Sequence, residues 1–220
     1  MKYAEFLSDF FPFWEKLSDA QKTALCEGTT EIVYPRTHVV HDPNECTGAI
    51  ILKSGCLRAY ILSEDGKEIT LYRLYAGDIC ILSATCILRA ITFDVMIEAD
   101  TDAECLVIES RALGKIVEEC IYAKNYVLEI TASRFSETMW SFEQIMFMSF
   151  EKRLAIFLLD ESARQRSDTL KLTHEQIAKY MGSAREVVTR MLRAFSAEGI
   201  VSGGRGDLHI LDKQKLRKYL

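Results

Sequence analysis

Two arginines, a glutamate and a threonine lie at helical spacing in the last quarter of the chain. Arg185 and Glu186 are adjacent, and Thr189 and Arg190 follow one turn later. A guanidinium can donate two hydrogen bonds to the O6 and N7 atoms of guanine, and a carboxylate can accept one from the amino group of cytosine. This set therefore predicts base contacts in the major groove of DNA. The alternative is a solvated helix face whose charges bind nothing.

These residues need a helix that is held against a second helix. Thr173 with Gln176 three residues later is typical of a capping box at a helix start, and Ser183 with Glu186 repeats the pattern. Gly182 supplies a turn between the two helices. The expected inward residues are Ile177, Ala178, Met181, Val187, Val188, Met191 and Leu192. This pattern predicts a helix-turn-helix, with Thr173 and Ser183 among its DNA-binding residues.

A glycine-rich turn follows the second helix. Residues 202–207 read Ser-Gly-Gly-Arg-Gly-Asp and separate two strand-like runs. This arrangement predicts a β-hairpin wing with Arg205 at its tip. A cation on a glycine-rich tip can approach a phosphate closely, so Arg205 is a further candidate for DNA binding.

The charge of the chain is divided between its two parts. The 220 residues carry a net charge of −5. Residues 150–220 hold 14 Lys and Arg against 9 Asp and Glu, whereas residues 1–149 hold 13 against 23. The C-terminal part is therefore basic, at +5, and the rest is acidic, at −10. Because DNA attracts basic surfaces, this division agrees with a helix-turn-helix in the C-terminal part.

Cellular location and cysteine chemistry can also be inferred. The sequence has no long apolar run and no signal segment at its start, so we expect a cytoplasmic protein with no membrane partner. Its seven cysteines are odd in number and include no C-x-x-C pair. This pattern argues against a disulfide framework and a zinc ribbon, and most of the cysteines are expected to be buried apolar residues. We predict no metal and no cofactor.

Residues 30–109 change to a period of two. Short strand-like runs alternate with turn signals at 42–44, 53–55 and 76–78. Many short strands at near-even spacing indicate a small antiparallel barrel or jelly roll. Two short helices are expected before it, the second capped by Ser18 with Gln21. An acidic roll of this kind suits a sensor domain.

A helical period returns at residue 110 and continues through Cys120 to Met148. It contains apolar and hydroxyl residues that recur every seven positions as one seam. The seam consists of Leu128, Thr131, Phe135, Thr138, Phe142 and Ile145. Such a seam could pack on the roll, but a helix of about 25 residues is longer than a small roll can cover. We therefore favour a parallel homodimer that pairs through this seam.

This order of parts resembles the Crp/Fnr family of bacterial transcription regulators. The likeness is sharpest at 172–178, 182–192 and 198–201, and the glycine turns at 52–58, 65–68 and 75–78 also match. The resemblance implies an α+β fold. Its expected parts are a cyclic-nucleotide-binding-like jelly roll (double-stranded β-helix) at 1–120, a dimerisation helix at 121–147 and a winged helix-turn-helix domain at 148–220.

The resemblance also implies a function and partners. Arg185, Glu186 and Arg190 match positions with which this family reads its half-sites, and Thr189 stands where one branch has a small hydroxyl residue. A homodimer on double-stranded DNA is implied, on an inverted repeat with half-sites resembling TGTGA or TTGAT. RNA polymerase is an expected further partner, and a signal sensed in the roll is expected to control binding.

The sensor segment departs from the family pattern. Cyclic-nucleotide-binding members resemble one another in a Gly-Glu pair followed by Arg-Ser or Arg-Thr, which hold the cyclic phosphate. Here the Gly77-Asp78 turn is followed by apolar residues without that pair, so cyclic AMP is not the expected effector. The closely spaced N-terminal cysteines of an Fnr-type cluster are also absent. The candidate sensor residues are Cys80, Ser83, Thr85, Cys86 and Arg89.

Several roles for this segment stay open. It could line a pocket for a small apolar effector, or Cys80 and Cys86 could form a thiol redox switch. Both cysteines could also simply fill the core. Binding of haem or another iron cofactor, with His38 or His41 as a ligand, is a further alternative.

An enzyme on a cupin-like roll is the competing class of function. Such a site needs two or three histidines and a carboxylate on one metal. His38 and His41 are the only histidine pair in the expected roll, and no later strand histidine completes the set. His174-Glu175 lacks the second histidine of a zincin motif. We therefore predict that the chain is not an enzyme.

Overall fold

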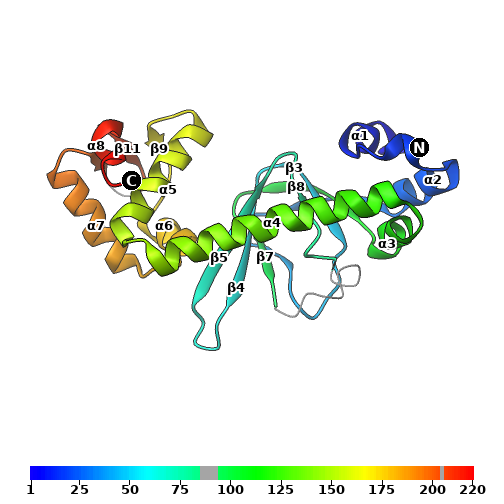
Figure 1. The fold of residues 1–220 in the computed structure, drawn as a ribbon, viewed down its shortest axis with the longest axis horizontal. Coiled ribbons are helices and arrows are strands. Elements are labelled where there is room, and N and C mark those ends of the chain that lie inside the picture. The colour runs from blue at the N-terminus through cyan, green and yellow to red at the C-terminus, as the bar shows by residue number, and fades with distance from the viewer. Residues whose placement is uncertain (85–93, 204–205) are drawn as a thin grey trace. The chain divides into compact units, whose positions relative to one another are not determined.

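The computed structural model describes residues 1–84, 94–203 and 206–220 (Figure 1). The chain divides into two compact units. The first comprises residues 1–63 and 71–138, and the second residues 64–70 and 139–220. Antiparallel sheets and helices occur in the chain, which confirms the predicted α+β class. None of the described helices combines the length and the apolar composition needed to cross a membrane.

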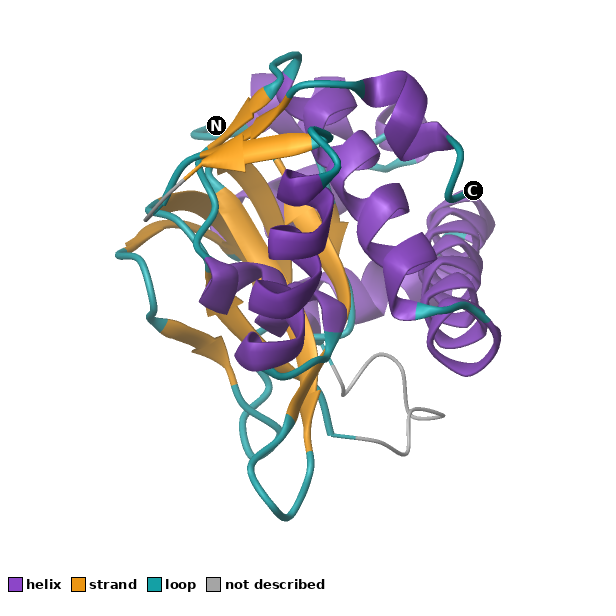
Figure 2. Cartoon of the chain, turned by 90° about the vertical axis from the view of Figure 1, so that its left-hand side faces the viewer, coloured by secondary structure: helices purple, strands orange, loops and turns teal. Residues whose placement is uncertain are grey.

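Two four-stranded antiparallel sheets form the roll, and their strands are among those drawn in orange in Figure 2. One sheet has the strand order β1-β8-β3-β6 and the other β2-β7-β4-β5. The strands are β1 Thr29–Tyr34, β2 Val39–His41, β3 Ala49–Ser54, β4 Cys56–Leu62, β5 Glu68–Tyr75, β6 Ile79–Cys80, β7 Met96–Ala99 and β8 Ala103–Ile108. These strands confirm the jelly roll predicted from the period of two.

Turn chemistry and apolar burial position these strands. Gly55, between β3 and β4, has a φ of +90°, and a Cβ atom there would lie 2.2 Å from the Asp102 carbonyl oxygen. Only glycine fits this turn without a shift of the backbone. Inward residues of both sheets, such as Leu52, Leu57 and Ile97, pack into one buried cluster. In β3 both faces are buried, because Ile50 and Leu52 enter this cluster and Ile51 enters the cluster under the helices.

Helices cover one side of this roll. They are α1 Ala4–Phe10, the 3₁₀ helix η1 Trp14–Lys16, α2 Asp19–Glu27, α3 Ser110–Glu119 and α4 Ile121–Phe147. Ser18 caps α2 in a complete capping box with Gln21, as predicted. Apolar residues of these helices, including Leu7, Leu25 and Leu113, form a second buried cluster with the strand residues Ile51 and Leu106.

The helical run predicted from 110 to 148 is broken at one residue. Cys120 adopts extended backbone angles, with φ −116° and ψ 110°, and separates α3 from α4. Its side chain is buried in the cluster that also holds Ala123 and Val127 of α4. The helical pattern that runs through Cys120 is therefore divided into two helices, and the second, α4, has the bounds 121–147 expected of the long helix. Periodicity alone missed the break because Cys120 is apolar and buried, as a helical residue at that position would also be.

The second unit contains the winged helix-turn-helix. Its elements are α5 Phe150–Gln165, β9 Thr169–Leu170, α6 His174–Met181, α7 Arg185–Ala197, β10 Val201–Gly203, β11 Leu208–Ile210 and α8 Lys213–Arg217. The three strands form an antiparallel sheet in the order β10-β11-β9. Leu158, Ile177, Val188, Phe195 and Ile200 are fully buried in its core. The helix-turn-helix and the wing strands confirm the predicted fold of this part.

Candidate nucleic-acid interface

Helix α6 begins and ends as the sequence predicts. The Thr173 hydroxyl accepts a hydrogen bond from the Gln176 backbone N–H at 3.1 Å, and the Thr173 backbone N–H donates to Gln176 Oε1 at 3.0 Å. Both bonds of a capping box are therefore present. Gly182 ends the helix with φ +58° and ψ 43°, a left-handed conformation that glycine adopts readily.

Helix α7 begins one residue later than the sequence predicted. Its N-cap is Ala184, and no side chain caps it. Ser183 still belongs to the end of α6, because its backbone N–H donates to the Ala178 carbonyl at 3.0 Å. The predicted Ser183–Glu186 capping box is therefore absent. After a helix that ends in a left-handed glycine, the backbone N–H of the next residue commonly bonds to a carbonyl of that helix. Because Ser183 makes this bond to α6, it is not the N-cap of α7.

Burial fixes which face of α7 is outward. Val188, Leu192 and Phe195 are buried, whereas the predicted inward residues Val187 and Met191 are half-buried. The three buried residues belong to the cluster that also contains Ile177 and Ala178 of α6. The turn between the helices and this shared core together hold the opposite face of α7 toward solvent.

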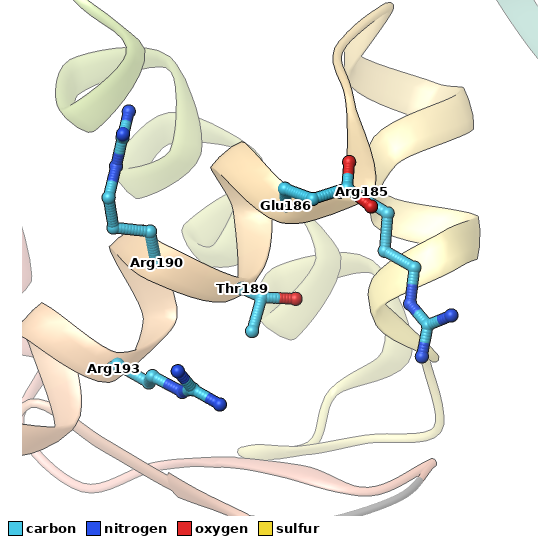
Figure 3. Close-up of a pocket in the computed structure, with 5 residues that line it drawn as sticks. All are labelled: Arg185, Glu186, Thr189, Arg190 and Arg193. Carbon is cyan, nitrogen blue, oxygen red and sulfur yellow. The ribbon is translucent and has the colours of Figure 1, made fainter.

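The outward face carries the residues that the sequence selected. Arg185, Glu186 and Arg190 are exposed, and Thr189 is half-buried. Together with Arg193 they line an open hollow of about 430 Å³. Figure 3 shows Arg185 and Arg190 at opposite ends of this row, with Thr189 between them. Sequence reasoning missed Arg193, although it lies four residues after Thr189 and therefore on the same helix face.

The charges of this face are solvated rather than neutralised. Arg185 Nε lies 4.0 Å from Glu175 Oε2, and both side chains are more than half exposed, at 65% and 61%. Exposed pairs at such a distance contribute little to stability. The row contains three arginines and one glutamate. It can therefore present guanidinium groups to an anionic ligand.

One more residue borders this row without having been selected from the sequence. The Nδ1 atom of His174, the first residue of α6, lies 2.9 Å from the Thr189 hydroxyl. Burial lowers the pKa of His174 below its usual value, and the positive charges of Arg185 and Arg193 lower it further. The surroundings of His174 therefore favour its neutral form in the protein alone.

The two strands of the wing are present as predicted. Strands β10 and β11 pair Val201 with Ile210 and Gly203 with Leu208. The predicted phosphate-binding residue Arg205 lies outside the described residues. The hairpin expected from the glycine-rich sequence is thus present in its two strands.

The predicted seam of α4 contains large exposed side chains. Leu128, Phe135 and Phe142 expose 55%, 66% and 52% of their surface, and Ile145 exposes 40%. The hydroxyls of Thr131 and Thr138 donate to carbonyl oxygens of their own helix, each at 2.8 Å. The opposite face of α4, including Ala123 and Val127, is buried against the roll. An apolar stripe is therefore left in contact with water.

Two of the predicted sensor residues are packed into the roll. Cys80 is buried, and burial raises the pKa of its thiol. The Ser83 hydroxyl is buried and donates to the Gly48 carbonyl at 2.6 Å. A protonated, enclosed thiol is a poor redox sensor, so these contacts favour a packing role for Cys80. The remaining candidates Thr85, Cys86 and Arg89 lie outside the described residues.

A different cysteine carries a disulfide bond. Cys46 is disulfide-bonded. The Ser110 hydroxyl lies 3.0 Å from its Sγ atom. Neither the odd number of cysteines nor their spacing suggested this bond. The other described cysteines, Cys26, Cys56, Cys80, Cys105 and Cys120, are free and buried.

The roll also buries an ion pair that sequence reasoning missed. Arg58 is fully buried, and its Nη2 atom lies 2.8 Å from Glu98 Oε1. The guanidinium carbon lies 4.1 Å from the centre of the Tyr60 ring. Arg58 and Glu98 are directly opposite each other on β4 and β7, 40 residues apart in the chain. Only the strand register brings them together.

The histidines named as possible iron ligands have other neighbours. The His38 ring stacks on Tyr34, with 5.4 Å between the ring centres. His41 is buried, its Nδ1 atom lies 2.8 Å from the Thr47 hydroxyl, and burial lowers its pKa. Among the residues that the structure describes, no group of three or more His, Cys, Asp or Glu could hold a metal ion.

A jelly roll, a long helix and a C-terminal winged helix-turn-helix with a cationic outward face define a DNA-binding transcription regulator. Comparison with known proteins agrees. Residues 31–120 match the model of the cyclic nucleotide-binding domain, and residues 152–219 match that of the Crp-like helix-turn-helix domain. A solved structure of a Crp/Fnr-family transcriptional regulator from Eubacterium rectale is 44% identical. It covers 96% of this chain and 98% of its own, with a TM-score of 0.90. The chain belongs to the Crp/Fnr family.

More distant relatives have the same class of function. The transcriptional activator protein anr of Pseudomonas aeruginosa is 23% identical over 75% of this chain and 69% of its own length. The probable transcriptional regulator flp of Lacticaseibacillus casei is 22% identical over 94% of this chain and 95% of its own length. The chain is thus a transcription regulator with a DNA-binding helix-turn-helix. This agrees with the prediction that it is not an enzyme.

Proposed function

We propose that the chain acts as a homodimer that reads an inverted repeat in double-stranded DNA through α7. The observation that carries this proposal is the exposed row of Arg185, Glu186, Thr189 and Arg190 on a helix whose opposite face is buried. A recognition helix held in this way can enter the major groove and contact base edges. The expected half-site resembles TGTGA or TTGAT. Thr173, Ser183 and Arg205 are expected to contact the backbone beside it.

Three segments of the chain have separate proposed roles. Residues 1–120 act as the sensor, 121–147 pair the two subunits, and 148–220 bind DNA. The exposed stripe of α4 supports pairing, because contiguous apolar surface of this kind commonly marks an interface. Two copies would place two recognition helices about one turn of DNA apart. RNA polymerase is the expected partner of the DNA-bound dimer.

The proposed signal acts in the roll and is not cyclic AMP. The sequence after Gly77-Asp78 lacks the glutamate and the arginine pair that hold a cyclic phosphate. Two guanidinium groups of this unit, one fully buried and one half-buried, already contact carboxylates. Arg58 pairs with Glu98, and Arg134 lies 3.2 Å from Asp78. A small apolar effector and a change in redox state are the two alternatives, and either would act by shifting the register of the paired α4 helices.

Selection of bound sequences from random duplex DNA tests this function. The purified full chain would be used with reductant and again after mild oxidation. We expect an inverted repeat of TGTGA-like or TTGAT-like half-sites. Recovery in one redox state alone would point to a cysteine sensor, with Cys46 the first to substitute. Recovery in both states would favour an apolar effector. Enrichment of a single half-site or of no sequence would contradict the proposal.

The dimer has its own test. Phe135→Glu places a carboxylate in the middle of the seam, where pairing would bring it close to the same residue of the second copy. We expect the dimer dissociation constant to rise by at least about a hundredfold, because two like charges would have to be desolvated together. Analytical ultracentrifugation measures the change.

A neighbouring substitution provides the control. Ser136 is exposed and lies outside the seam, so Ser136→Glu should leave the dimer intact. If Phe135→Glu sediments as the wild type does, the seam is not the interface. If the wild-type chain is a monomer at every concentration, the dimer proposal itself is wrong.

A further inference from the structure

His174 stands at the edge of the proposed DNA-reading face and shares a hydrogen bond with it. Its Nδ1 atom lies 2.9 Å from the hydroxyl of Thr189, which lies between Arg185 and Arg190 in the reading row. The ring is only partly buried. No hydrogen bond to a described residue involves its Nε2 atom. One ring nitrogen is thus held by α7, while the other can contact a ligand.

Protonation changes what this pair can donate. In a neutral imidazole one nitrogen donates and the other accepts, so the Thr189 hydroxyl can either donate to Nδ1 or accept from it. In a protonated imidazole both nitrogens donate. Nδ1–H then donates to Thr189, whose own hydrogen is released to point elsewhere, and Nε2–H becomes a cationic donor.

The charged surroundings oppose this protonation in the protein alone. Arg185 and Arg193 of α7 face the ring and lower its pKa, after burial, which has the largest effect. On α6 the neighbouring Glu175 faces Arg185. A phosphate close to Nε2 would reverse the balance, since a nearby anion favours the charged form of an imidazole. The pKa of His174 would therefore rise when DNA binds, and a proton would be taken up.

The geometry points to His174 as a phosphate-binding residue that Thr189 orients and that makes DNA binding proton-linked. This inference rests on the proposed function, because it needs the outward face of α7 to meet DNA. Affinity should then increase as pH falls, over the range between about pH 7.5 and pH 5.5 in which histidine titrates. In the complex with DNA, His174 would be a neutral donor above this pH range and a cation below it.

Titration of DNA affinity against pH and salt tests the inference. The full chain would be measured by fluorescence anisotropy with labelled duplexes that carry two TGTGA or two TTGAT half-sites as inverted repeats. We expect affinity to rise roughly tenfold for each unit by which DNA raises the pKa of one histidine. The plot of log affinity against log salt should also become steeper, by about 0.9 for each protonated histidine.

Variants assign these effects to a residue. His174→Gln keeps a polar side chain but cannot be protonated, so both the pH dependence and the extra salt slope should be lost. Thr189→Val should reduce the pH dependence because the ring is no longer oriented. His209 on β11 is the second histidine of this unit, and its Nδ1 atom faces Thr169. His209→Gln should behave as the wild type.

The outcomes separate this inference from the proposed function. A wild-type affinity that does not change with pH overturns it, and so does an unchanged pH dependence in His174→Gln. If either result is found but Arg190→Ala still removes base preference, α7 remains the DNA-reading helix. His174 is then not a proton-linked contact of that helix face. If Arg190→Ala and His174→Gln both bind as the wild type does, α7 is not the DNA-reading helix.

Discussion

The two units of the chain hold their arginines in opposite ways. In the roll, Arg58 is fully buried and lies 2.8 Å from the carboxylate of Glu98. On α7, Arg185 and Arg190 are exposed, and the nearest carboxylate to Arg185, that of Glu175, lies 4.0 Å away. A buried guanidinium already has the anion that it needs, whereas an exposed one can bind an anion from another molecule. Charge is therefore paired inside the roll, whereas on α7 it is left available for the proposed contacts with DNA.

The largest expected effect tests the structural half of this contrast. Glu98→Ala removes the carboxylate that lies 2.8 Å from the buried guanidinium of Arg58, and we expect the roll to lose up to about 3–5 kcal/mol of stability. Urea unfolding followed by the fluorescence of Trp14, which is buried in the same unit, measures the loss. Glu104→Ala on the exposed side of β8 is the control and should cost less than about 0.5 kcal/mol. Equal losses would show that Arg58 does not depend on Glu98.

The binding half of the contrast predicts a smaller and selective loss. Arg190→Ala should weaken binding by roughly 1–3 kcal/mol at its cognate guanine and flatten the preference at that position. Arg205→Ala, at the predicted wing tip, should weaken binding to all sequences alike and reduce the salt dependence. Affinities for duplexes with single base changes in the half-site distinguish the two patterns. If both variants lose affinity equally on all sequences, the assigned roles are wrong.

The smallest expected effect concerns the scaffold that presents the arginines. Thr173→Ala removes the hydroxyl that caps α6 and should cost about 1 kcal/mol. Ser183→Ala should cost less than about 0.5 kcal/mol, because no side chain caps α7. Hydrogen exchange of the α6 and α7 amides measures both changes. A larger loss for Ser183→Ala would indicate that this hydroxyl does cap α7.

Local features of the fold were the most predictable from the sequence. The capping boxes of Ser18 and Thr173 involve residues three apart, and both are present. The buried residues Ile177, Ala178 and Met181 follow from helical periodicity, and the strands of the roll follow from short strand-like runs between turn signals. Each of these signals lies within a few residues of the chain, where side-chain chemistry and backbone geometry determine each other directly.

Features that depend on distant residues were not predictable in this way. Arg58 meets Glu98 through the register of β4 and β7, and His174 meets Thr189 across the turn of the helix-turn-helix. The disulfide at Cys46 also depends on a partner brought near by folding. Within the candidate site, spacing identified the row on α7 but gave no sign of its histidine neighbour. A pattern along one helix cannot show which residue of another helix packs beside it.

The apolar stripe on α4 has a consequence for gene dosage. Under the proposed dimer, a single subunit would carry one recognition helix and an exposed row of large apolar side chains, and only pairing would cover that row. At concentrations where single subunits predominate, the amount of paired protein rises with the square of the chain concentration. Doubling expression would then raise occupancy of a weak operator up to about fourfold. Operator occupancy would thus depend more steeply on the concentration of this regulator than on that of a DNA-binding protein that acts as a monomer.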